Sequence, residues 1–306
     1  MLKFILKDTN GKITELKKPL KVSFVSSEEA PADRLTAVFA VDGNIPVIES
    51  VEMLDGIERL FYGLVDEQVT EETAEGMLLT VYARSLACIL LDNEAMPQTY
   101  CIPSMPLLMK RHFSPLGFEH FIGSDEAFNG EMTVSKGMSE WTVLKSFCDA
   151  FIGTVPRIHT DGTIDITGNI NETVYLQPER IISIKRSLKN KNLISQMIAR
   201  TYTGGGYEMQ IENNSAKRLG IKRRRYINSI DSKSRTVLTA KRLMKKSFSE
   251  YEQITADCCG RILCSIGAQL IIGRDKKHYI VKEINYSFDS SGEHTKIYAR
   301  LKREDE

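Results

Sequence analysis

Apolar and polar residues alternate in short segments along the first 92 residues of the chain. A period of two is typical of strands that bury one face. The alternation predicts strands at residues 3–7, 13–16, 21–25, 34–41, 57–67 and 77–84, a turn at Asn10 and Gly11, and a small helix at 85–91. Strands so short and so closely spaced predict a β-barrel or a β-sandwich.

Helical periodicity joins the strands between residues 93 and 169. One helix is predicted near 104–112, with Ser104 as its N-cap and Pro106 in its first turn. A second helix is predicted between a capping residue, Ser139, and a terminating glycine, Gly153. Its apolar residues recur every three or four positions and define the face expected to be buried, with the tryptophan as a core anchor: Trp141, Leu144, Cys148 and Phe151.

A β-hairpin is expected directly after the second helix. Asp161 and Gly162 both tolerate a positive φ, which suits a tight reversal between two strands. The apolar residues on either side of this turn lie at alternate positions: Val155, Ile158, Ile164 and Ile166. The segment 93–169 is therefore predicted to be a small mixed α+β domain.

Strand patterns return after residue 169, at 181–187, 196–202, 208–212, 279–286 and 295–301. A helix is predicted at 234–252, with one apolar face and one basic face. The apolar face holds Val237, Ala240, Met244, Phe248 and Tyr251, and the basic face holds Lys241, Arg242, Lys245 and Lys246. Residues 204–206, three glycines, are predicted to form a loose connection, because no helix with a Lys-Ser/Thr pair follows them.

These patterns together predict a mainly β fold with an α+β insertion. Two β-barrel-like domains, at 1–92 and 170–306, flank the small mixed domain at 93–169, and the last domain carries a basic segment and one long helix. The two β-rich parts share no alignable repeat beyond the spacing of their strands.

Several of these segments occur in an order that resembles a known family. The central stretch 137–168 combines a Ser-x-Trp-x-x-Leu helix start, an apolar strand, Asp-Gly and an alternating strand. Residues 32–35, 59–66 and 78–84 upstream and 267–270 downstream add to the likeness. In this order the chain resembles the baseplate hub proteins of contractile phage tails and phage-like bacteriocins, the late control D class.

The resemblance implies a structural role without a catalytic site or a cofactor. Hub proteins of this class carry two related barrels per chain, so that a homotrimer presents six barrels and joins a six-fold tail tube to a three-fold spike. The expected partners are the tail spike protein, the tail tube or tube-initiator protein, other baseplate proteins and possibly the tape measure. Such a protein would be made in the bacterial cytoplasm and incorporated into a virion or a tail-like particle.

Composition sets further bounds on the class of protein. The 306 residues suffice for two or three domains, and 41 Lys and Arg against 40 Asp and Glu leave a net charge of +1. The N-terminus is charged within its first few residues and shows no secretory signal, so the six cysteines are expected to be free thiols. No apolar run approaches the roughly 20 residues of a membrane span, and insertion into a membrane is not expected.

The near-zero net charge hides two blocks of opposite sign. Residues 24–76 hold thirteen Asp and Glu against two Arg, a balance of −11. Residues 180–250 hold eighteen Lys and Arg against four acids, a balance of +14. The basic block can be a solvated face, a nucleic-acid surface or a subunit contact. Only Tyr226 accompanies the arginine run, and a nucleic-acid surface usually offers more aromatic residues, so specific nucleic-acid binding is not expected.

Subunit pairing is the preferred hypothesis for the two blocks. The acidic part of one copy would lie beside the basic part of the next, with the contact residues Lys222, Arg223, Arg224, Arg225, Glu67, Glu71 and Glu72.

Motifs for catalysis or metal binding are weak in this sequence. Cys258, Cys259 and Cys264 lack paired CxxC spacing and a nearby histidine, and they are typical of a core strand rather than a zinc site. The five histidines are scattered, and each is expected to be exposed or half-buried. The alternative function is a cell-wall-binding or cell-wall-hydrolysing tail-tip protein. Its catalytic pair would be Asp125 with Glu126, or Asp161 with Asp165, and each pair falls in a turn or hairpin.

Overall fold

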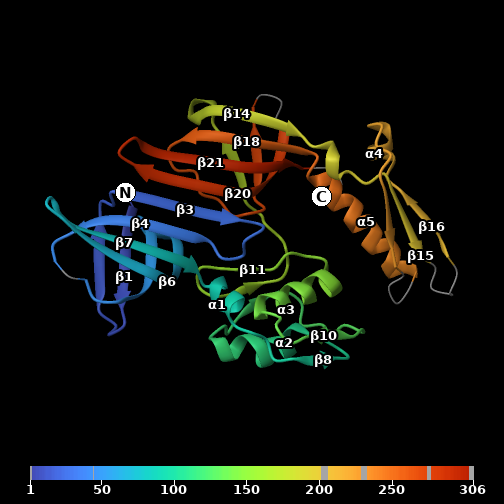
Figure 1. Ribbon diagram of the computed structural model, residues 1–306, viewed down its shortest axis with the longest axis horizontal. Helices are drawn as coiled ribbons and strands as arrows, with labels where there is room; N and C mark the ends of the chain where they lie inside the picture. Colours follow the sequence, from blue (N-terminus) through green and yellow to red (C-terminus); the bar gives the residue numbers. More distant parts are fainter. Residues whose placement is uncertain (1, 44, 201–205, 229–232, 274–276, 303–306) are drawn as a thin grey trace. The chain divides into compact units, whose positions relative to one another are not determined.

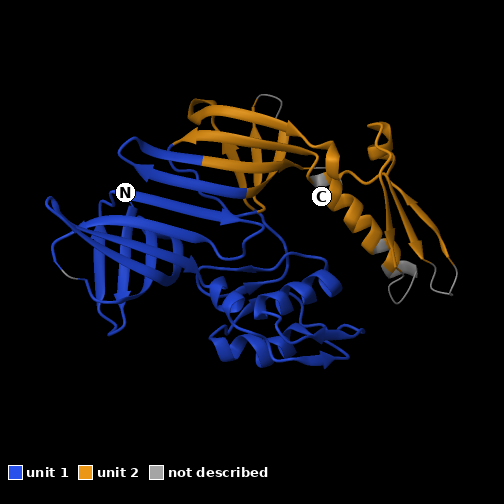
Figure 2. Ribbon diagram, viewed as in Figure 1, with its two compact units in different colours: residues 1–171, 260–266, 283–295 blue, residues 172–259, 267–282, 296–306 orange. Residues whose placement is uncertain are grey.

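The computed structural model describes residues 2–43, 45–200, 206–228, 233–273 and 277–302. Strands account for 49% and helices for 19% of the structure, so the prediction of a mainly β fold with α+β insertions is confirmed. The chain divides into two compact units, shown in Figure 2. Unit 1 contains residues 1–171, 260–266 and 283–295, and unit 2 contains 172–259, 267–282 and 296–306. The three-domain division with boundaries after Asp92 and Asn169 stays a prediction.

The first β region of unit 1 is an antiparallel sheet (Figure 1). Its strands are β1 (Leu2–Asp8), β2 (Ile13–Lys17), β3 (Lys21–Ser27), β4 (Arg34–Val41), β5 (Ile48–Asp55), β6 (Glu58–Thr73) and β7 (Gly76–Ser85). They follow the order β3-β4-β7-β6-β5-β1-β2, and the later half of β20 (Lys277–Asp289) pairs with the free edge of β3. The predicted turn after β1 is present, with Gly11 at φ +82°.

Inward-facing residues fill the core of this sheet. Phe4 and Phe39 contact edge to face with ring centroids 5.1 Å apart, and Phe24 and Phe61 do the same at 6.1 Å. Tyr286 on β20 is also buried in this cluster. The alternation that predicted the strands therefore places one side chain in two inside the core, as the pleat of a strand requires.

The middle segment of unit 1 contains short helices and small sheets. Its elements are α1 (Ala87–Asp92), β8 (Gln98–Tyr100), α2 (Met105–Leu108), a π-helical turn (Met109–Phe113), a 3-10 turn (Ser114–Leu116), β9 (Phe121–Ile122), β10 (Met132–Val134), α3 (Glu140–Phe147), a second π-helical turn (Cys148–Ile152), β11 (Arg157–Ile158) and β12 (Ile164–Asp165). Both predicted N-caps form, because Ser104 Oγ accepts from Leu107 N–H at 3.4 Å and Ser139 Oγ accepts from Thr142 N–H at 3.2 Å.

The buried face of α3 differs from the expected one. Val143, Leu144, Phe147 and Cys148 are fully buried, whereas Trp141 is only half-buried and packs against the edge of the cluster. The prediction of Trp141 as a core anchor is therefore wrong: the helix is rotated so that the positions after it point inward. Gly153 terminates the π-helical turn at φ +91°, as expected.

The predicted hairpin is formed by β11 and β12. Gly162 has φ +88°, His159 N–H donates to Thr163 O at 2.9 Å, and Asp161 accepts from Thr163 N–H at 2.9 Å. Each strand is only two residues long, and β12 pairs in parallel with β9 on its other side.

Unit 2 contains a second β region. Its strands are β13 (Thr173–Leu176), β14 (Ile181–Leu188), β18 (Glu252–Cys259), β19 (Gln269–Ile272), the first part of β20 and the last part of β21 (Gly292–Leu301), with 3-10 turns at Pro178–Arg180 and Asn190–Asn192. The order is β14-β18-β21-β20-β19-β13. Ile254, Ala256, Leu270 and Tyr279 are buried in its interior.

An α/β insertion lies between β14 and β18. It consists of β15 (Gln196–Arg200), β16 (Tyr207–Glu212), α4 (Asn214–Arg218), β17 (Arg224–Ile227) and α5 (Lys233–Ser249). Ala240 and Met244 of α5 pack on Met197 of β15, while the four predicted basic residues of the helix are exposed. The helix ends at Ser249, three residues before the predicted end, and residues 204 and 205 of the glycine run lie outside the described residues.

Candidate interaction surfaces

The three predicted acidic contact residues are exposed on β6. Glu67 and Glu71 lie opposite Tyr82 and Leu78 of β7, so they share the outward face of the hairpin with Val69 between them. Glu72 points to the other face. Val69 is 40% exposed, so the surface of this hairpin mixes carboxylates with apolar side chains.

Ion pairs within unit 1 neutralise much of the acidic block. Arg84 Nε lies 2.6 Å from Asp66 Oδ2 and Arg84 Nη2 lies 2.6 Å from Asp92 Oδ2, and the hydrogen bond from Arg84 lowers the pKa of Asp92. Arg59 pairs with Glu52, and Arg261 pairs with Asp55. Glu67, Glu71 and Glu72 form no ion pair within 4 Å among the described residues, so the excess charge of the block is concentrated on this part of β6.

The four predicted basic contact residues are not equivalent. Lys222, Arg224 and Arg225 are exposed. Arg223 is half-buried, and its Nη1 donates to Leu193 O at 3.0 Å and to Asn190 O at 3.3 Å. Arg223 therefore holds the loop after β14, and the expectation that all four residues are available for a partner is wrong for this one.

A second tyrosine accompanies Tyr226. Tyr207 of β16 contacts it edge to face with ring centroids 5.3 Å apart, and Tyr207 Oη donates to Asn228 Oδ1 at 2.8 Å. Both rings are exposed, at 46% and 60%. The sequence could not show this pair because Tyr207 lies 19 positions before Tyr226. The rings contact each other, which differs from separate platforms on which successive bases would stack.

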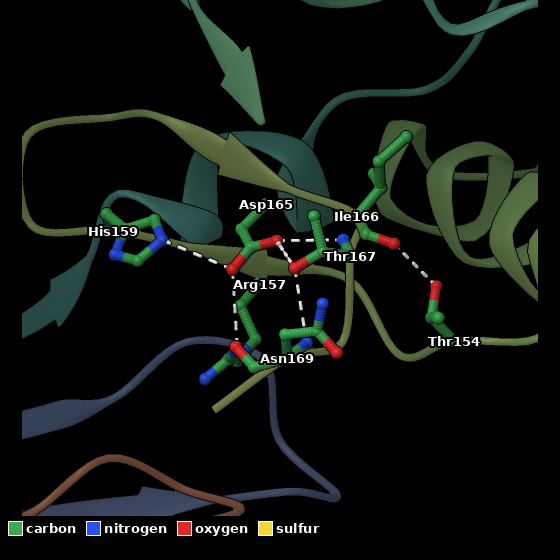
Figure 3. Close-up of polar contacts among 7 residues, drawn as sticks. All are labelled: Thr154, Arg157, His159, Asp165, Ile166, Thr167 and Asn169. Atoms are coloured by element: carbon green, nitrogen blue, oxygen red, sulfur yellow. Dashed lines mark hydrogen bonds and ion pairs between the residues drawn. The ribbon is translucent and has the colours of Figure 1, made fainter. Parts of the chain in front are cut away.

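Figure 3 shows a polar cluster around Asp165, one of the carboxylates in the alternative catalytic pair. Asp165 is buried, and its Oδ1 accepts from Thr167 N–H at 2.8 Å and from Thr167 Oγ1 at 2.7 Å. Its Oδ2 lies 3.3 Å from Arg157 Nη2 and 3.5 Å from His159 Nε2.

The Asp165 cluster is built to hold the chain rather than to react. Burial raises the pKa of Asp165, but the bonds from Thr167 and the charges of Arg157 and His159 outweigh it and hold the pKa below the ordinary value. Arg157 Nη2 also donates to Asn169 O at 3.0 Å, and Thr154 Oγ1 donates to Ile166 O at 2.7 Å. These bonds tie the hairpin to the helix before it and to the chain leaving it.

The other candidate carboxylates are exposed. Asp125 and Glu126 lie in a loop, and Asp161 caps the hairpin turn, where the N–H of Thr163 lowers its pKa. Cys258 is buried in β18 and burial raises the pKa of its thiol to about 11, while Cys259 is exposed. Among the described residues no group of three His, Cys, Asp or Glu side chains is placed to hold a metal ion.

A buried chain of polar side chains in the middle segment was missed. His112 is 1% exposed, with Nδ1 2.8 Å from Glu140 Oε2 and Nε2 2.7 Å from Tyr100 Oη. The expectation that every histidine is exposed or half-buried is wrong here. Met105, Leu108, Met109 and His112 share one helical face, and that spacing is the signal that could have placed the histidine inside. The cluster joins β8, the turn after α2, and α3.

No model of a known protein family matches this sequence, and no curated protein is significantly similar to it. Solved structures do match its fold. A tail protein from Neisseria meningitidis superposes with a TM-score of 0.78 at 14% identity, covering 98% of this chain and 96% of that one. The 43 kDa tail protein of prophage MuSo2 from Shewanella oneidensis gives 0.79 at 16% identity, covering 98% of both chains.

A third structure extends the fold to secretion systems. The Escherichia coli c3393 protein, a type VI secretion component described as similar to the T4 tail proteins gp27 and gp5, gives a TM-score of 0.60 at 9% identity, covering 94% of this chain and 74% of that one. The chain therefore has the fold of phage-tail and type VI secretion proteins over nearly its whole length. In the described part of the chain, no helix has the length and apolar character needed to cross a membrane.

Proposed function

We propose that this protein is a structural hub subunit of a phage tail or contractile injection particle. It forms a homotrimeric ring in which each chain contributes two barrel-like β regions, so that near-six-fold contacts face the tail tube and three-fold contacts face the spike. The observation that carries the proposal is the match of 98% of the chain to tail proteins from two bacteria. The similarity of a third fold relative to the T4 tail proteins gp27 and gp5 adds to it.

The proposed partners follow from this place in the particle. They are the tail spike protein, the tail tube or tube-initiator protein, other baseplate proteins and the tape measure. The protein is made in the bacterial cytoplasm and then built into the particle. It is not an enzyme, because Asp165 is committed to holding the hairpin and the other candidate carboxylates are exposed.

Opposite charges on the two β regions orient neighbouring subunits. The exposed carboxylates of β6 approach the basic residues of unit 2 in the next copy, and Lys222, Arg224 and Arg225 are accessible for this. Attraction of this kind speeds association and weakens with salt, because the Debye length is only about 8 Å at physiological ionic strength.

The mass of the purified protein in solution, with negative-stain images, tests the proposal. We expect three times the chain mass of 34.6 kDa and rings with an open centre. A protein that stays monomeric at all concentrations and salt conditions would contradict it. An assay on peptidoglycan, for which we expect no cleavage, separates the hub from a cell-wall hydrolase.

A further inference from the structure

Strand β14 is a free edge with apolar side chains exposed. It ends its sheet, and among the described residues its only strand partner is β18. Ile184 and Arg186 lie opposite the buried Ala256 and Ile254 of β18, yet both are exposed, and Leu188 is 62% exposed. An edge strand with unpaired N–H and C=O groups and uncovered apolar residues is a site for pairing with another strand.

The outer part of β6 is a second free edge. β5 pairs with β6 only as far as Leu64, and the side chain of Gln68 then bonds the backbone of Ile45, Pro46 and Ile48 beside it. From Val69 to Thr73 the described strands pair with β6 on one side only, through β7. Figure 1 shows the β6–β7 hairpin extending beyond the neighbouring strands.

We propose that β14 of one copy adds to the outer part of β6 of the next copy as an antiparallel strand. This proposal rests on the proposed ring, whose subunit contact it specifies. The register that aligns the two edges has four opposed pairs: Leu188 with Val69, Arg186 with Glu71, Lys185 with Glu72, and Ile184 with Thr73.

This register satisfies both faces of the new strand pair. On one face Leu188 meets Val69 and Arg186 meets Glu71, and on the other face Lys185 meets Glu72. None of these four charged residues forms an ion pair within 4 Å among the described residues, so each is available. A shift by one residue would place the charges on opposite faces, which fixes the register.

The contact joins two different surfaces of the same chain. Such a head-to-tail contact generates either a closed ring or an open filament, and three copies close the ring in the proposed trimer. The carboxylates are those already predicted for the contact, but the basic partner is β14 rather than the Lys222 to Arg225 run.

Disulfide trapping tests the register directly. Opposed residues of antiparallel strands have Cα atoms about 4.5–5.5 Å apart, within the range that a disulfide spans. Mixing the single variants Glu72→Cys and Lys185→Cys under mild oxidation should give a covalent dimer on a non-reducing gel. The matched control is Glu71→Cys mixed with Lys185→Cys, whose sulfurs point to opposite faces and should give no dimer. The parent protein, oxidised in parallel, accounts for the exposed Cys101 and Cys259.

Charge reversal gives an independent measurement. Arg186→Glu should weaken subunit association about tenfold, equivalent to about 1.4 kcal/mol. Glu71→Arg should do the same, and the double variant should recover association. Lys191→Glu and Glu75→Arg make the same charge changes at exposed positions outside the paired strands and should leave association within about twofold.

The outcomes separate this inference from the proposed function. Trimeric rings that give no dimer from the 72 and 185 pair, or equal dimer from both cysteine pairs, overturn the strand pairing and leave the hub in place. A monomer under all conditions overturns both. Recovery of association in the double charge variant supports the pairing, and failure to recover it contradicts the pairing.

Discussion

The two β regions treat their inward-facing positions differently. In the first, β4 places Leu35, Ala37 and Phe39 inside the core, each at most 1% exposed. In the second, β14 leaves Ile184 and Leu188 exposed although they lie on a single strand beside a buried core. The first region therefore completes its core within the chain, while the second keeps one strand uncovered. Residues that stabilise the fold and residues that serve assembly should accordingly be separable by mutation.

The largest effect is expected in the closed core. Phe39→Ala removes a ring that contacts Phe4 edge to face and leaves a cavity, and it should lower the free energy of unfolding by about 3–5 kcal/mol. Urea denaturation of the purified variant measures this. Ile13→Ala on β2, where the side chain is 66% exposed, is the control and should cost less than about 0.5 kcal/mol. Equal losses in the two variants would contradict the contrast between core and edge.

A smaller loss is expected for the buried carboxylate of the middle segment. Asp165→Asn keeps the shape but weakens the bonds from Thr167 and Arg157, and it should cost about 1–3 kcal/mol at pH 7. The folded pKa of Asp165 lies below the unfolded value, so its stabilisation is present above about pH 4 and is lost as the pH falls through the folded pKa.

Urea midpoints at several pH values check both parts of the Asp165 prediction. The difference between the parent and the variant should shrink as the pH falls below 4. A difference that stays constant with pH would mean that the charge of Asp165 contributes nothing. Asp161→Asn at the exposed turn is the matched control.

Asp33 should show the opposite sign. Burial raises its pKa to about 6, against which the hydrogen bond from Ser26 acts only in part. The protonated form therefore stabilises the fold fully below about pH 4, and this contribution is lost as the pH rises to about 6. Asp33→Asn should raise the free energy of unfolding at pH 7 by about 1–2 kcal/mol, and the gain should vanish near pH 4. A variant less stable than the parent at pH 7 would contradict the assignment.

The regular strands could be predicted from the sequence because their cores are one-sided. β4 has the predicted bounds, and its neighbours differ by a few residues. β5 was missed because the register shifts between Lys7 and Asp8 of its partner, which separates the buried Ile48 and Val51 by three positions and breaks the alternation. The outer part of β6 was missed because residues 68–73 are almost entirely polar, and only pairing with β7 makes them a strand.

The candidate surfaces could be predicted only in part. Counting charges found both blocks, but a count cannot show which charges are used inside the fold. Arg84 binds two of the acids, and Arg223 binds backbone carbonyls. The exposure of β14 was also hidden, since Ile-Ile-Ser-Ile is typical of a buried strand. Its free edge depends on the strand order, which no local pattern contains.

The smallest effect on stability is expected at that edge. Ile184→Ser on β14 removes an apolar side chain that is already 37% exposed, so the free energy of unfolding should change by less than about 0.5 kcal/mol. If the open strand serves assembly, the same variant should still weaken the trimer, because its apolar surface would be covered there. Urea denaturation at low protein concentration measures the first quantity, and light scattering across a dilution series measures the second. A variant as destabilised as Phe39→Ala, with unchanged association, would show that β14 belongs to the core and would remove the contrast between the two regions.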